Sequence, residues 1–175
     1  IASKAFVRII DLSEVKLSEL QAIYGNNNIE YIVSSEHAVA EALKDSDLVI
    51  GAVYVVGKKA PKIIKTEMLK SMKAGAVLVD ISIDQGGCFE SSRPTTHDNP
   101  TYTVDGVIHY CVTNMPGAVP LTATKALNKS TLQYVKELAN KGINKALEDN
   151  KHLANGLNIS KGEVVHPAVK EALSS

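Results

Sequence analysis

The sequence has little of several features that would narrow its function. Its two cysteines, Cys88 and Cys111, lack CxxC spacing and are too few for a disulfide framework. Basic and acidic residues number 19 each, so no charge excess favours nucleic acid or an anionic membrane as a partner. There is no apolar run of about 18 residues, as a membrane span needs, and no signal-peptide pattern at the start. We therefore expect a cytoplasmic protein.

Motifs for two kinds of ligand are also absent. The five histidines and two cysteines are scattered, without HExxH or a close ligand pair, so no metal site is expected. No GxGxxG occurs anywhere, although this turn normally holds the pyrophosphate of a dinucleotide. The composition, 45% hydrophobic and 22% charged over 175 residues, is ordinary for a globular α/β protein with a real core.

Hydrophobic patterning predicts alternating strands and helices in the first half. Residues 1–5 resemble the end of a helix, strands are expected at 6–10, 29–33, 47–56 and 76–83, helices at 12–24, 36–44 and 63–73, and a loop at 57–61. This alternation implies right-handed crossovers and a parallel sheet. Gly51, within a very apolar strand, either lets a flat ligand approach or serves packing, and the pattern leaves both open.

The second half has a different pattern. Two extended runs, 101–104 and 107–112, flank Asp105-Gly106, which indicates a hairpin or a turn between neighbouring segments. A long helical pattern follows over 121–149, and a short last helix is expected from about Pro167.

Asp84 is the strongest candidate for chemistry. It follows the buried run AVLVDISI and precedes Gly86 and Gly87, and ligands of open α/β sheets bind at the carboxyl ends of strands. Its carboxylate could orient a substrate amine, assist a histidine or bind a ribose, unless it is a solvated turn residue. Asn114, before a proline turn, could pair with a carboxamide or carboxylate, or stabilise the turn.

Other polar residues have plainer interpretations. Asp11 closes a strand, where an acidic residue can bind the adenosine ribose. Without a glycine-rich turn upstream, a plain strand-end or helix-capping carboxylate is favoured. His97 and His109 are expected to be structural, and Arg93 to form a surface salt bridge.

Three blocks of sequence resemble the alanine dehydrogenase family. They are DLVIGAVYVVGKKAPKII (47–64), VLVDISIDQGGCFESSRPTTHDNPTYTVDGVIHYCVTNMPGAVPLT (77–122) and LANKGINKAL (138–147). The related transhydrogenase subunit shares the APK loop and the strand after it, but not the DQGGCFE–RPTTH run or the NMPGAVP turn. The resemblance implies reversible, NAD-dependent deamination of L-alanine to pyruvate and ammonia.

The resemblance also implies roles for particular residues. Asp84 corresponds to the family's active-site aspartate, beside the nicotinamide ribose, and Asn114 to an asparagine that faces substrate and cofactor. Tyr54 departs from the aliphatic residue usual at its position. The implied cofactor contacts are Asp11, Ser34, Ala52, Val53, Tyr54, Ile81, Asp84, Asn114 and Met115. A carboxylate at Asp11 favours NAD over NADP, because it repels a 2′-phosphate.

The resemblance covers only the carboxyl-terminal half of the family's length. The expected fold is a partial Rossmann-type parallel sheet flanked by helices (1–122), then a long helix and a short terminal segment (123–175) that would pack on a substrate domain. That domain, the first strand and the glycine-rich turn are missing. Two hypotheses follow: part of a hexameric or two-chain enzyme, or an inactive fragment or split-gene product that acts as an assembly partner.

Overall fold

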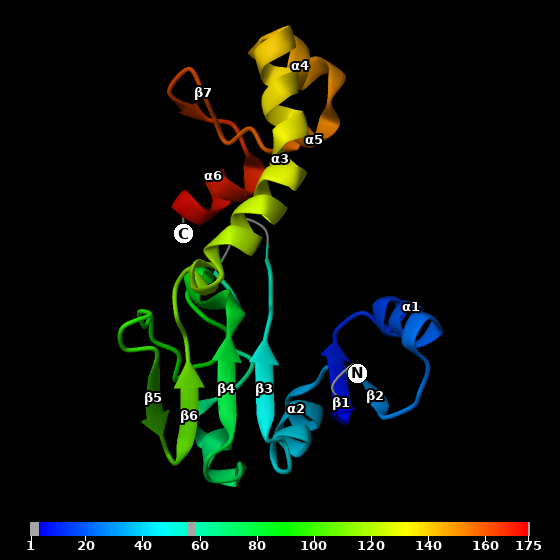
Figure 1. The fold of residues 1–175 in the computed structure, drawn as a ribbon, viewed down its shortest axis with the longest axis vertical. Coiled ribbons are helices and arrows are strands. Elements are labelled where there is room, and N and C mark those ends of the chain that lie inside the picture. Colours follow the sequence, from blue (N-terminus) through cyan, green and yellow to red (C-terminus); the bar gives the residue numbers. More distant parts are fainter. Residues whose placement is uncertain (1–3, 56–58, 175) are drawn as a thin grey trace. The chain divides into compact units, whose positions relative to one another are not determined.

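The computed structural model describes residues 4–55 and 59–174 (Figure 1). Residues 1–3 of the expected helix end and residues 57–58 of the expected loop lie outside these ranges. By their contacts the residues divide into two compact units, the first comprising those up to Val53 and Ala60–Thr113, the second Tyr54–Lys59 and those from Asn114 onward. Among the described residues, no helix combines the length and hydrophobicity needed to cross a membrane.

The first unit begins with a small parallel sheet. Strand β1 (Val7–Asp11) pairs in parallel with β2 (Ile29–Val33), and helix α1 (Glu14–Tyr24) connects them. Helix α2 (Glu36–Leu43) follows, and its amino end is capped by the hydroxyl of Ser35, which accepts from Ala38 N. These elements confirm the strands and helices predicted between residues 6 and 44.

A second, four-stranded sheet has the order β3-β4-β6-β5. Strands β3 (Leu48–Gly51), β4 (Val77–Asp80) and β6 (Val107–Tyr110) are parallel, and β5 (Thr101–Val104) is antiparallel to β6. Figure 1 shows the three parallel strands pointing the same way. Asp105 and Gly106 both have positive φ, 48° and 80°, as a two-residue hairpin turn requires. The hairpin interpretation is therefore confirmed.

Three predicted elements differ from the structure. The strand predicted over 76–83 ends at Asp80, and a 3₁₀ helix, η2 (Ile81–Gln85), replaces its second half. The strand predicted over 47–56 ends at Gly51. The helix predicted over 63–73 is a 3₁₀ helix, η1 (Thr66–Ser71).

Hydrogen bonds explain the first and third differences. Ile81 and Ile83 favour strand by propensity, but the Asp80 carboxylate accepts from Ser82 N and turns the chain. Ile63 and Ile64 are extended, since Ile63 N donates to Cys88 O and Ile64 bridges to Phe89. The few residues that remain before Met72 form only a short 3₁₀ helix.

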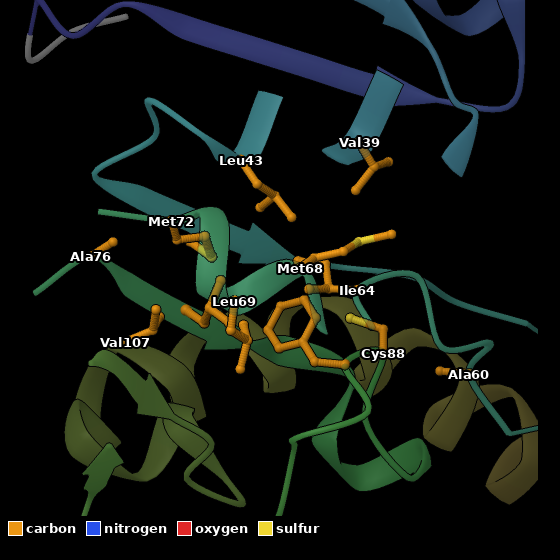
Figure 2. Packing of buried hydrophobic residues seen from close by; sticks show 12 residues of the cluster. Val39, Leu43, Ala60, Ile64, Met68, Leu69, Met72, Ala76, Cys88 and Val107 are labelled. Atoms are coloured by element: carbon orange, nitrogen blue, oxygen red, sulfur yellow. The ribbon is translucent and has the colours of Figure 1, made fainter. Parts of the chain in front are cut away.

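The core of the first unit lies between α2, η1 and the four-stranded sheet. Its buried side chains pack together in Figure 2: Val39, Leu43, Ala60, Ile64, Met68, Leu69, Met72, Ala76, Leu78, Cys88, Phe89 and Val107. Gly51 belongs to this packing, because a Cβ there would lie 2.6 Å from Phe89 Cζ and also meet the Cys88 sulfur. The glycine is therefore a packing residue.

Strands β1 and β3 of the first unit each have one unpaired edge. Among the described residues, β1 pairs only with β2, and β3 pairs only with β4. Ile10 of β1 and Val49 of β3 both pack against the core cluster, and Leu48 and Ile50 of β3 are more than half exposed. The predicted parallel sheet is therefore present as two separate ladders.

The second unit is mainly helical. Its elements are η3 (Met115–Ala118), α3 (Pro120–Lys141), α4 (Ile143–Asp149), α5 (Lys151–Asn155), the hairpin β7 (Ile159–Ser160) and β8 (Glu163–Val164), and α6 (Pro167–Ser174). The single helix predicted over 121–149 is wrong in one respect, because Gly142, at φ 72°, ends α3 and α4 begins directly after it. The last helix, from Pro167, is confirmed.

Candidate functional site

Asp84 lies in η2, directly beyond the carboxyl end of β4. Its residue is exposed, and no hydrogen bond or ion pair joins its carboxylate to any residue in 4–55 or 59–174. The neighbouring Ser82 and Ile83 are buried and hold the turn in place. The structure therefore presents a carboxylate to the outside on a short turn that is itself anchored.

The strongest anchor of this turn is Asp80, whose side chain is completely buried. Oδ1 accepts from Ser82 N at 3.0 Å and lies 3.4 Å from the Cys88 thiol, which donates to it. Oδ2 accepts from Cys88 N at 2.9 Å and from the Ser92 hydroxyl. One carboxylate thus binds both ends of the 82–88 segment, with Asp84 between them.

A second anchor joins the turn to the end of β3. The Ser82 hydroxyl donates to Val53 O and accepts from Val53 N, both at 2.8 Å. Val53 and Ile81, both predicted cofactor contacts, are therefore held near one another, and Ala52 and Ile81 are exposed. The structure thus places Ala52, Val53, Ile81 and Asp84 around one turn.

The APK loop supports the same turn from outside. The Lys62 ammonium donates to Gly86 O at 2.6 Å and to Gly87 O at 2.8 Å. Ala60 N donates to Gln85 O at 3.0 Å, and Ile63 N to Cys88 O at 2.8 Å. The loop therefore runs alongside residues 85–88 and fixes their carbonyl groups.

Gly87 is required by its conformation and by its surroundings. Its φ is +73°, and a Cβ there would lie 2.7 Å from Asp80 Oδ2 and 2.7 Å from Ser92 Cβ. The glycine therefore lets the chain pass directly over the buried carboxylate.

The cysteines are poor nucleophiles in this environment. Burial, followed by the charge of Asp80, raises the pKa of the Cys88 thiol to about 12. Cys111 is also completely buried. Thiol chemistry at Cys88 is therefore disfavoured at neutral pH. Within the described ranges, no group of three or more His, Cys, Asp or Glu residues is placed to hold a metal ion.

His109 lies in a polar cluster behind the turn. Its Nδ1 is 3.0 Å from Val107 O, an acceptor, so Nδ1 carries the proton and Nε2 accepts from the Ser91 hydroxyl at 2.7 Å. Burial lowers the pKa of His109, which keeps the ring neutral. The His109 ring stacks on the ring of Tyr102. The Arg93 guanidinium lies over the Tyr102 ring, 4.0 Å from its centre.

Asp11 and Ser34 meet at the carboxyl ends of β1 and β2. Ser34 N donates to Asp11 O at 2.9 Å, and Asp11 Oδ1 accepts from Ser13 N at 2.8 Å. The helix cap is Ser13, whose hydroxyl accepts from Lys16 N, so Asp11 is a strand-end carboxylate with one oxygen bound by Ser13 N. A hollow of about 230 Å³ adjoins Ser34, lined by Leu12, Ser34, Ser35, Glu36, Val39, Lys62, Ile63 and Lys65. Ser34 therefore shares a hollow with Lys62, the lysine that holds the Asp84 turn.

The remaining predicted site residues belong to the second unit. Asn114 is exposed and has a left-handed backbone, φ 55°, at the amino end of η3, and Met115 is half-buried. Tyr54 is 71% exposed. Their roles toward a ligand remain predictions.

Sequence reasoning missed the residues that hold the turn: Lys62, Asp80, Ser82 and Ser92. Asp80 carried a usable signal, because a carboxylate that ends a buried apolar strand needs donors close by. Lys62 and Ser92 carried none, since their partners are distant in sequence and only the fold brings them together.

Comparison with protein families gives a match over residues 2–167 to the C-terminal domain of alanine dehydrogenase/PNT. The chain belongs to this family. It is 52% identical over 168 residues to an alanine dehydrogenase of Halomonas elongata, covering 96% of this chain and 45% of that protein. An alanine dehydrogenase of Staphylococcus saprophyticus is 50% identical, with 97% and 46% covered. The chain thus spans about half the length of the curated relatives it matches.

Solved structures agree with this membership. The fold superposes on an L-alanine dehydrogenase with a TM-score of 0.83 at 47% identity, covering 96% of this chain and 46% of that one. A transhydrogenase from Sinorhizobium meliloti has a TM-score of 0.70 at 24% identity, which shows the shared fold alone. The predicted α/β class, with a parallel sheet flanked by helices, is confirmed.

Proposed function

We propose that this chain is the nucleotide-binding part of an NAD-dependent L-alanine dehydrogenase, which converts L-alanine reversibly into pyruvate and ammonia. The observation that carries the proposal is Asp84, an exposed carboxylate on an anchored turn at the carboxyl end of a parallel strand, within a chain of the alanine dehydrogenase/PNT family. When bound, NAD would supply the hydride acceptor for the alanine Cα. In our proposal the Asp84 carboxylate accepts hydrogen bonds from the substrate amine and orients it.

The residues of the chain fit NAD at two places. At the ends of β1 and β2, the Asp11 carboxylate has an oxygen beyond the one that accepts from Ser13 N, and ribose hydroxyls can donate to it. Around η2, Ala52, Ile81 and Asp84 form an exposed edge that a nicotinamide and its ribose can cover. We propose that Ser34 contacts the adenine end of NAD and Val53 its nicotinamide end. We also propose Tyr54, Asn114 and Met115 of the second unit as cofactor contacts, with Asn114 facing the substrate.

The pyrophosphate needs residues that the 175 residues do not include, since they contain no GxGxxG. We propose that a strand and turn outside this sequence enter between the unpaired edges of β1 and β3. Residues 1–122 would then belong to the nucleotide-binding domain, and residues 123–175 would pack on a substrate domain and on further subunits, as in a hexamer. A cytoplasmic location is part of the same proposal.

One assay tests this function directly. Formation of NADH from L-alanine is measured with the chain alone and with a complementary segment that carries the glycine-rich turn and substrate domain. We expect no activity from the chain alone and activity from the mixture. Within that mixture, Asp84→Asn should lower turnover by more than about tenfold. The carboxylate has two oxygens that can accept hydrogen bonds from the substrate amine, whereas the asparagine side chain has only one. Unchanged turnover would remove Asp84 from the mechanism.

A second candidate function is assembly without catalysis. Several apolar side chains of α3 are largely exposed, with values of 70% for Leu121, 63% for Leu127 and 58% for Val135. Together with the open edges of β1 and β3, these surfaces favour association with another polypeptide. A complex with the complementary segment that forms no NADH would support this function over the enzymatic one.

A further inference from the structure

We infer that Asp80 is a positioning residue, which fixes the place of the Asp84 carboxylate through the turn that both residues share. The inference rests on the proposed function for the role of Asp84. It concerns a residue to which sequence reasoning gave no role and which is not exposed to a ligand, since its side chain is completely buried.

The donors around Asp80 show how the carboxylate acts. Two are backbone amides, Ser82 N at 3.0 Å and Cys88 N at 2.9 Å, and two are side chains, the Ser92 hydroxyl and the Cys88 thiol. All four donors are neutral, so none of the bonds that hold this buried carboxylate is an ion pair. The carboxylate therefore holds the 82–88 segment strongly, because releasing either end would leave a buried charge with fewer donors.

These bonds also fix the position of Asp84, because they hold the turn on both sides of it. Ser82 precedes Asp84 and Cys88 follows it, and both are bound to the same carboxylate. Ser82 is also bonded to the backbone of Val53, so the turn keeps its register with the end of β3. An exposed catalytic group held in this way is pre-organised, and displacement by about 1 Å can cost up to about a hundredfold in rate.

The substitution Asp80→Asn tests the inference with little change in volume. An amide nitrogen would then face a hydrogen-bond donor, and the turn would lose an anchor at one end. Asp47→Asn is the matched control, because Asp47 is an exposed aspartate in the same unit whose carboxylate pairs with Lys73 at 2.8 Å.

The first measurement is a double-mutant cycle on alanine-dependent NADH formation by the active mixture. We expect Asp80→Asn to lower kcat by about tenfold or more, and Asp47→Asn to leave kcat and KM for NAD unchanged. If Asp80 acts through Asp84, the Asp80→Asn, Asp84→Asn double variant should turn over no more slowly than Asp84→Asn alone. Unchanged kcat in Asp80→Asn, or effects that multiply, would overturn the inference.

The second measurement does not depend on activity. Iodoacetamide labelling, followed by peptide mass spectrometry, gives the separate rates at Cys88 and Cys111. In Asp80→Asn we expect Cys88 to react about tenfold faster, because its turn opens locally and the Asp80 charge that raises the pKa of its thiol is lost. Cys111 should stay within about twofold of its original rate, and Ser92→Ala, which keeps the Asp80 charge, isolates the effect of opening. An equal rise at both cysteines would show general loosening and overturn the inference.

The two measurements separate the two proposals. Absence of NADH in every preparation would refute the proposed function, and labelling would still decide whether Asp80 holds the turn. If Asp80→Asn does not fold, Ser92→Ala removes one hydroxyl donor and leaves the carboxylate in place. Ser92→Ala should also raise the labelling rate of Cys88, by a smaller factor than Asp80→Asn. An unchanged labelling rate would count against the inference.

Discussion

Replacing Gly87 by alanine should be among the most destabilising single-methyl changes in this protein. The position has φ +73°, and the new Cβ would lie 2.7 Å from both Asp80 Oδ2 and Ser92 Cβ. A left-handed conformation costs a residue with a Cβ about 1–2 kcal/mol, and overpacking costs about 1–3 kcal/mol. We therefore expect the free energy of unfolding to fall by about 2–5 kcal/mol.

Two other glycines separate these contributions. Gly75 has φ +85° with nothing within 4 Å of an added Cβ, so Gly75→Ala tests conformational strain alone, at about 1 kcal/mol. Gly51→Ala tests crowding alone, against Cys88 and Phe89, at about 1–3 kcal/mol. The assay is equilibrium urea unfolding followed by circular dichroism, where about 2 kcal/mol shifts the midpoint by about 1 M for a slope of about 2 kcal/mol/M. Equal midpoints for Gly87→Ala and Gly75→Ala would refute the claim that Asp80 lies directly under the turn.

Two further predictions concern buried polar groups. The lowered pKa of His109 means that the unfolded chain binds its proton more tightly, so stability should fall as pH decreases below about 6.5. Urea midpoints between pH 7.5 and 5 should show this slope, His37→Gln should keep it, and a His109→Gln variant with the same slope would contradict the assignment. Ser82→Ala removes both bonds to Val53 and should cost about 1–3 kcal/mol, whereas the exposed Ser18→Ala should stay within about 0.5 kcal/mol. Equal unfolding midpoints for these serine variants would show that the Ser82–Val53 bonds contribute nothing.

Local patterns predicted most elements of the first unit well. The strands that became β1 and β2, the two early helices α1 and α2 and the Asp105-Gly106 hairpin depend on neighbouring residues, and all are present. The patterns failed at Ile63 and at Ile81, where apolar β-branched residues lie in segments shaped by Cys88, Asp80 and Val53. Propensity is weak beside such bonds, so the boundaries of η1 and η2 needed the tertiary structure.

In the candidate site, too, some residues could be found from the sequence and others only from the structure. Asp84 could be found in the sequence, because a carboxylate before two glycines at the end of an apolar run is a local signal, and family resemblance gave it a role that stays a prediction. The residues that hold it could not be found, since Lys62 and Ser92 are distant in sequence from their partners Gly86 and Asp80, and only the fold brings them together. Asn114 and Met115 lie in a separate compact unit, and their part in the site also stays a prediction.

The sequence alone therefore determined the α/β class, the family and the position of one exposed carboxylate, because these depend on hydrophobic period and on motifs continuous along the chain. Only the tertiary structure decided that Asp84 lies in a 3₁₀ turn and that a second, buried aspartate binds both ends of that turn. The physical reason is that a buried charge must collect its donors from wherever the fold supplies them. For Asp80 these donors come from three residues that follow it at different distances along the chain.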